Sequence, residues 1–133
     1  MKTTWVAMVA LVLLGYATSG WAHHSFAAEF SADKPVLFKG TVTKMEWVNP
    51  HVWIHVQVTK PGGKAEDWAI EGGAPGSLFK RGFSKASLVP GTVIVVDGYA
   101  AKDGSRRANG RSVTFEDGKK LFVSSSGAGA PSQ

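Results

Sequence analysis

The chain of 133 residues contains no cysteine. Disulfide bonds, thiol nucleophiles and cysteine-ligated metal centres are therefore excluded. A domain without disulfides must be held by a packed core, and five tryptophans, seven phenylalanines and many valines supply apolar side chains for one. The chain also lacks a G-x-S-x-G motif, and GGAPGS (residues 72–77) does not have the spacing of a phosphate-binding loop.

Long hydrophobic runs are scarce as well, and the clearest is VAMVALVLLGYA at residues 6–17. A helix needs about 20 residues to span a bilayer, so this run is too short for an anchor. Lys2 precedes it, and Gly20 and Ala22 supply the small-x-small pattern that a signal peptidase recognises. The pattern predicts a cleavable signal peptide over residues 1–22 and a periplasmic or secreted protein. Cleavage after Gly20 is an alternative.

Removing the signal peptide leaves enough residues for one domain. We expect an N-terminal arm over residues 23–35, a folded domain over 36–123, and a disordered small and polar tail over 124–133. The formal charge of +5 falls to about +4 without Lys2. The charges are scattered, and GSRRANGR (residues 104–111) is typical of a solvated loop. Export argues against a nucleic-acid partner.

The folded part has strand-like patterns, with one exception. In HVWIHVQV (residues 51–58) apolar and polar residues alternate, as in a strand with one buried face. Pro75 and Gly82 mark the ends of a short helix within residues 74–83. Further strands are predicted at residues 36–49, 66–72, 92–100 and 111–123, the last as a hairpin. Three strands, a helix and two or three strands predict an all-β, OB-like barrel, with a β-sandwich as the alternative.

Four histidines are candidate metal ligands: His23, His24, His51 and His55. Cleavage after Ala22 would place the α-amino group on His23, so the amine and ring of one residue can chelate a metal ion. The α-amine loses its proton far more readily than a lysine does. A second imidazole from His51 would complete a three-nitrogen site that favours Cu(II). His24 supplies a competing chelate or a further ligand.

His51 and His55 lie about 13 Å apart if both are in one strand, so they are not expected to bind one ion together. Glu71 ends a predicted strand and is a candidate second-shell or ligand-binding residue. The same role is assigned to Asn49, beside His51, and to Trp47 and Trp53, which could stack on a ligand. Packing in the core or at its rim is the alternative for both tryptophans. No acid–base couple is evident, so no enzymatic activity is predicted.

Several motifs together resemble a known family. They are HHSFAAEF (23–30), GTVTKMEWVNPHVWIHV (40–56), WAIE (68–71), LFKRGF (78–83) and AKDG (101–104). They are similar to those of a family of small exported bacterial proteins, domain of unknown function family 6152, over residues 23–122. The matching positions are His23, His24, Phe26, Glu29, Phe30, Trp47, Asn49, Pro50, His51, Trp68 and Glu71.

The resemblance implies export but no reaction. Ser31 stands where the pattern has Asp, and Phe83 where it has Trp. His55 falls where the family often has another residue, which weakens its candidacy as a ligand.

Two functions follow from these observations. The first is an exported binding protein with a copper-preferring site, formed by the mature N-terminus and His51, that stores, delivers or senses the metal. The second is a metal-free periplasmic interaction module. In the second, Phe26 and Phe30 pack on the barrel, and the surface around Trp47, Trp53 and His51 binds a protein, a glycan or a small ligand.

Overall fold

The computed structural model describes residues 26–124. The predicted signal peptide, His23, His24 and nearly all of the predicted tail lie outside these residues. The described part consists of a helical turn at residues 26–29 and the following elements: β1 (Phe30–Glu46), β2 (Trp53–Thr59), β3 (Ala65–Glu71), α3 (Pro75–Lys80), β4 (Val93–Ala101), β5 (Arg107–Phe115) and β6 (Lys120–Phe122). No helix within residues 26–124 is long and apolar enough to cross a membrane.

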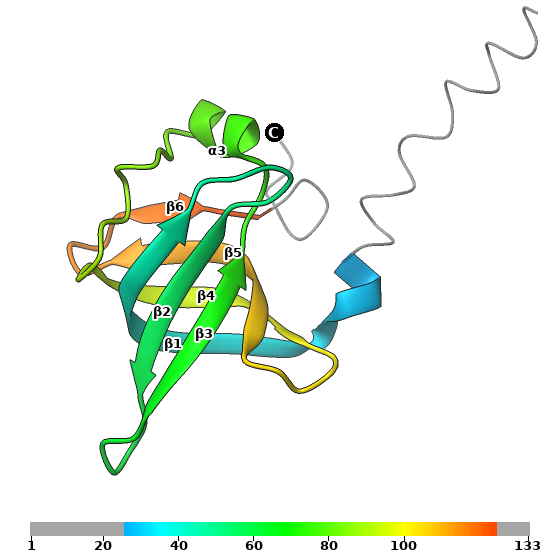
Figure 1. Cartoon of the computed structure of the whole chain (residues 1–133), viewed down its shortest axis with the longest axis vertical. Helices are drawn as coiled ribbons and strands as arrows, with labels where there is room; N and C mark the ends of the chain where they lie inside the picture. Colours follow the sequence, from blue (N-terminus) through cyan, green and yellow to red (C-terminus); the bar gives the residue numbers. More distant parts are fainter. Residues whose placement is uncertain (1–25, 125–133) are drawn as a thin grey trace, which may run out of the picture.

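The six strands form one sheet in the order β3-β2-β1-β4-β5-β6 (Figure 1). A further pairing of β3 with β5 joins strands from the two sides of that order, so the hydrogen bonds run in a ring. This pairing is parallel, and all the others are antiparallel. The β-rich class and the position of the helix between the third and fourth strands confirm the sequence prediction at this level.

Two strands begin earlier than predicted. β1 starts at Phe30 and not at residue 36, because Phe30 pairs with Ala101 across a register irregularity that precedes Pro35. β5 starts at Arg107 and not at residue 111. Polar and small residues in both segments hide the strand pattern, and pairing with neighbouring strands outweighs their low β propensity.

The core confirms the alternation predicted for β2. Val52, Ile54 and Val56 are at most 1% exposed and point inward. Each such side chain contributes about 1.5–3 kcal/mol through burial. Leu78 of α3 and Phe83 join the same core, and α3 lies at one end of the ring (Figure 1).

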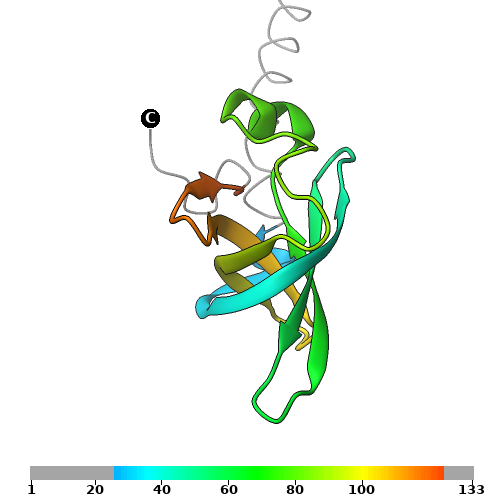
Figure 2. The same cartoon turned by 90° about the vertical axis from the view of Figure 1, so that its left-hand side faces the viewer.

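The helix α3 ends before Gly82, whose positive φ of 81° allows the chain to turn back. At the other end of the molecule, the β2–β3 hairpin projects beyond the remaining strands (Figure 2). The core therefore fills the ring, and the outward-facing side chains of the strands remain for other roles.

Candidate functional site

The strand register places four predicted or newly found residues side by side on the outside of the ring. Tyr99 pairs with Asn109, Asn109 with Glu71, and Glu71 with Trp53. Side chains alternate along a strand, and the sequence neighbours Ile54, Ile70 and Ala108 are buried in the core. The four side chains therefore share the outer face. We call Tyr99, Asn109, Glu71 and Trp53 the polar row.

His51 lies just before β2, at the end of the ring where the polar row runs. Its Nδ1 atom is 3.0 Å from the carbonyl oxygen of Gly72. A carbonyl oxygen only accepts hydrogen bonds, so Nδ1 must carry the proton and donate it. The lone pair of the neutral ring is then on Nε2. The side chain is 32% exposed, so a ligand can reach it.

Glu71 is the carboxylate beside this imidazole. Its Oε1 atom lies 3.5 Å from Nδ1 of His51, and its side chain is only 13% exposed. Burial raises the pKa of Glu71 above its ordinary value, because the charged form loses water. His51 and Arg107 oppose that rise, whereas Glu29 adds to it. The Glu71 carboxylate is therefore mostly buried, with both basic and acidic side chains nearby.

Asn109 completes the buried part of the polar row. It is 2% exposed, and its Oδ1 atom has no hydrogen-bond partner within the described part of the chain. Buried polar atoms are nearly always paired in native proteins. Asn109 was not predicted as a site residue because it lies in GSRRANGR, which was expected to be a solvated loop. That expectation is confirmed for residues 104–106, which are exposed and outside any strand, and is wrong for residues 107–111, which belong to β5.

Two arginines of the same segment form ion pairs with acidic side chains. Nε of Arg111 donates to Asp97 at 3.0 Å, and its guanidinium lies 5.9 Å from the centre of the Tyr99 ring. Arg107 pairs with Glu29 at 3.1 Å. A polar segment therefore forms a strand because its charges find partners on the outer face. The hidden signal was the alternation of Arg107, Asn109 and Arg111.

The helical turn at residues 26–29 is fixed next to the polar row. The Phe26 ring contacts Tyr99 edge-on at 5.7 Å and Phe30 at 6.0 Å between centroids. Phe30 itself is 2% exposed. Phe26 thus packs on the sheet, and Phe30, which was expected in the arm, is the first residue of β1.

Two hydrogen bonds from Lys102 also hold the helical turn at residues 26–29. The Lys102 backbone N–H donates to the Glu29 carbonyl at 2.8 Å, and its side chain donates to the Ala27 carbonyl. The turn therefore lies against the loop that joins β4 and β5 (Figure 1). Phe26, the first described residue, therefore lies at the Tyr99 end of the polar row.

The other candidate residues have different surroundings. Trp47 stacks on Phe83 at 6.0 Å with an interplanar angle of 11° and packs against the core. Trp53 is half-buried in the polar row, and Asn49 is exposed. Trp47 and Trp53 therefore do not form a joint open platform, since the ring of Trp47 is used in packing.

His55 has an acidic neighbour that the sequence did not reveal, although its Nε2 atom has no hydrogen-bond partner within the described residues. Its Nε2 atom lies 3.6 Å from Oε2 of Glu46, on the neighbouring strand β1. The pKa of Glu46 is lowered, first by the hydrogen bond from Lys44 and further by His55. No three histidine, aspartate or glutamate side chains come together as a metal site within residues 26–124. His51 and Glu71 are thus not joined by a third side chain of these types in that part of the chain.

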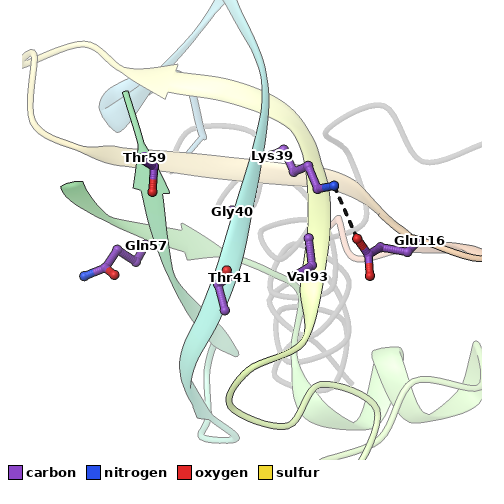
Figure 3. A pocket seen from close by; sticks show the side chains of 7 residues that line it. All are labelled: Lys39, Gly40, Thr41, Gln57, Thr59, Val93 and Glu116. Carbon is purple, nitrogen blue, oxygen red and sulfur yellow. Dashed lines mark hydrogen bonds and ion pairs between the residues drawn. The ribbon is translucent and has the colours of Figure 1, made fainter. Parts of the chain in front are cut away.

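A hollow of about 320 Å³ lies toward the other end of β2 (Figure 3). Gln57 and Thr59 line one side, Gly40 and Thr41 of β1 form its floor, and Val93, Lys39 and Glu116 line the other side. Lys39 and Glu116 form an ion pair at 3.3 Å, and both side chains are more than 60% exposed, at 64% and 67%. None of the predicted site residues that fall within residues 26–124 lines this hollow.

Comparison with known proteins supports the family resemblance. No curated protein and no solved structure is significantly similar to the chain. The sequence model of DUF6152, described as a family of unknown function, matches residues 10–111. That range includes the polar row, His51 and the helical turn at residues 26–29. The chain therefore belongs to the family of unknown function DUF6152.

Proposed function

We propose that this protein is an exported binding protein whose processed N-terminus and His51 together form a Cu(II)-preferring site. The ligands are the α-amine and ring of His23 and the ring of His51, with His24 or Glu71 as a further ligand or outer contact. The site stores, delivers or senses copper in the periplasm or outside the cell. The observation that carries the proposal is the hydrogen bond from His51 Nδ1 to the Gly72 carbonyl oxygen.

That bond prepares His51 as a ligand. Histidines that bind metals commonly donate their second ring N–H to a carbonyl or carboxylate, which fixes the tautomer and the ring orientation. His51 donates from Nδ1 to Gly72, with Glu71 3.5 Å away. Its Nε2 atom is left as the nitrogen that can bind a metal. An amine and two imidazoles suit Cu(II), which favours tetragonal nitrogen sites.

The reach of the chain supports the pairing of His23 with His51. Phe26 is packed on Tyr99, and the three residues from His23 to Phe26 span up to about 10 Å. Neighbouring strands lie about 4.8 Å apart, so Tyr99 and Glu71 are separated by about 10 Å across β5. His51 is beside Glu71. An N-terminus that begins at His23 can therefore extend along the polar row to His51.

The proposed fold is an OB-like barrel. The ring order β1-β2-β3-β5-β4, closed by the parallel β3–β5 pairing, and the helix between β3 and β4 are features of that fold. OB-folds commonly bind ligands on the face of the second and third strands. Glu71 and Trp53 lie on those strands, with His51 just before them. Trp53, Asn49 and Trp47 then serve as outer contacts that shape the site.

The test is a Cu(II) titration of the protein exported and processed by its host, after the intact mass has established the first residue. The His51→Ala variant and a variant with one glycine before His23 should each lose about 100-fold or more in affinity. Even a lost outer contact costs about 10–100-fold. His55→Ala is the matched control, because His55 lies on β2, four residues after His51, next to Glu46. Weak binding that is indifferent to His51→Ala would contradict the proposal.

The second candidate is a metal-free interaction module. The observation in its favour is that Phe26 and Phe30 contact one another and Phe26 contacts Tyr99, at one end of the polar row that includes the half-buried Trp53. It predicts a periplasmic protein, glycan or small ligand as partner. Binding of such a partner would be unchanged by the extra glycine and weakened by Trp53→Ala, and the copper titration would show only ordinary chelation by a peptide terminus.

A further inference from the structure

The side chain of Asn109 carries a buried hydrogen-bond acceptor that no donor in the described part of the chain satisfies. Its side chain is 2% exposed, and Oδ1 has no hydrogen-bond partner within residues 26–124. An amide oxygen buried in this way lowers stability unless an N–H or O–H group pairs with it. Asn109 is flanked in the polar row by Tyr99 on one strand and Glu71 on the other. A group that donates to Asn109 would therefore also lie next to a carboxylate.

The arginines nearby have other partners. Arg107 donates to Glu29, and Arg111 donates to Asp97. The two acceptors at the centre of the polar row, the Asn109 amide oxygen and the Glu71 carboxylate, are matched by a compact cationic group with several N–H donors. An ammonium group has that chemistry, because it carries three donors and a positive charge.

One ammonium group is within reach by chain length. The Phe26 ring contacts Tyr99, which is the strand neighbour of Asn109. The distance between neighbouring strands is about 4.8 Å, whereas three residues span up to about 10 Å. An α-amino group three residues before Phe26 can reach Asn109 and Glu71 without moving the helical turn.

We propose that the Asn109 amide oxygen and the Glu71 carboxylate together receive the α-amino group of the processed N-terminus, so that residues 23–25 dock on the polar row before any metal binds. The inference rests on the proposed function only in its cleavage site after Ala22. An amine that has given up a proton to solvent still carries two N–H donors, so the same two acceptors fit it when its lone pair faces a metal. Asn109 is then a positioning residue, and docking reduces the ordering cost of metal binding.

The test measures how fast the α-amino group is acylated in chelator-treated, host-processed protein at neutral pH, with mass spectrometry locating the label. The synthetic peptide HHSFAAEF, residues 23–30, is the undocked reference. Docking should slow labelling by about tenfold relative to the peptide, as expected for a terminus that is free about a tenth of the time. Equal rates for protein and peptide would overturn the inference.

Three variants show whether Asn109 is responsible. Asn109→Leu removes the acceptor at similar size and should restore the peptide's labelling rate. Asn109→Asp retains acceptor oxygens and should keep at least the parent's protection, which preserves the test if the leucine variant does not fold. Ser112→Ala is the matched control, because Ser112 is 1% exposed on the same strand. Protection that persists in Asn109→Leu, falls in Asn109→Asp or falls in Ser112→Ala would overturn the inference.

The amine-labelling test and the copper titration can fail independently of one another. Protection without copper binding at His51 would leave the docked N-terminus standing and remove the proposed metal function. Copper binding that depends on His51, with an unprotected amine in the metal-free protein, would do the reverse.

Discussion

The two ends of β2 carry outer surfaces of different kinds. Near His51, Glu71 and Asn109 are 13% and 2% exposed, and the imidazole is fixed by a backbone carbonyl. Near Gln57, the hollow is lined by exposed hydroxyl and amide groups and by the Lys39–Glu116 pair. The first surface has polar groups held in a partly dry environment, where hydrogen bonds and charges act strongly. The second has similar groups in water, where screening weakens them.

The comparison teaches that chemical type alone does not mark a site. Both ends of the strand offer a carboxylate and a basic side chain, but only at the His51 end are these groups partly buried. Substitutions that disturb the built end should therefore have large effects, and those at the hollow should have small ones.

The largest effect is expected from Phe83→Ala. Phe83 is fully buried and stacks on Trp47, which leads into the segment that carries His51. Loss of this ring should lower the free energy of unfolding by about 3–5 kcal/mol, as measured by urea denaturation. Phe79→Ala is the matched control, because Phe79 is 69% exposed, and it should change stability by no more than about 0.5 kcal/mol. Equal losses for the two variants would show that Phe83 does not support this end.

Gly98→Ala should be the next most severe change. A Cβ atom at Gly98 would lie 2.2 Å from the backbone oxygen of Asn109, so the bulge between β4 and β5 must shift. We expect a loss of about 3 kcal/mol in unfolding free energy together with faster exchange of the Asn109 amide hydrogens. Gly76→Ala is the control, since nothing lies within 4 Å of its Cβ position; in α3 it should be stabilising by up to about 1 kcal/mol. A well-folded Gly98→Ala protein with unchanged hydrogen exchange at Asn109 would show that the bulge does not position the polar row.

Glu71→Gln should alter how stability depends on pH. Burial raises the pKa of Glu71 in the folded protein, so the folded state disfavours the ionised carboxylate. The parent protein therefore loses stability from this group as the pH rises from below the unfolded pKa through the folded one. The glutamine variant avoids that loss and should gain relative to the parent across this range, with no difference at lower pH. Urea denaturation of chelator-treated protein at a series of pH values measures it. A parent that gains stability relative to the variant over the same range would mean that the cationic groups beside Glu71, among them His51, Arg107 and the docked α-amino group, outweigh burial.

Lys39→Ala at the hollow should have the smallest effect. The Lys39–Glu116 pair is exposed at both side chains, and such pairs contribute at most about 1 kcal/mol. A double-mutant cycle with Glu116→Ala measures the interaction alone. A coupling clearly above that size would show that the hollow is as well ordered as the His51 end.

Much of the fold could be predicted from local pattern. The alternation at residues 51–58 correctly gave the buried face of β2, and Pro75 and Gly82 correctly bracketed α3. The segment around Arg107 and Asn109 was misread because its residue types favour loops. Its strand depends on partners distant in the chain, such as Glu29 for Arg107 and Asp97 for Arg111, and such pairing is invisible to a local pattern.

The candidate site divides in the same way. The sequence alone singled out His51, Glu71 and the N-terminal histidines by residue type, by the cleavage pattern and by family resemblance. Only the tertiary structure decided that the parallel pairing of β3 with β5 brings Asn109 beside Glu71, and that Gly72 turns its carbonyl toward His51. The physical reason is that residue type and local alternation depend only on residues close together in the sequence. The burial, tautomer and hydrogen-bond partners of a group are set by strands that meet across long stretches of chain.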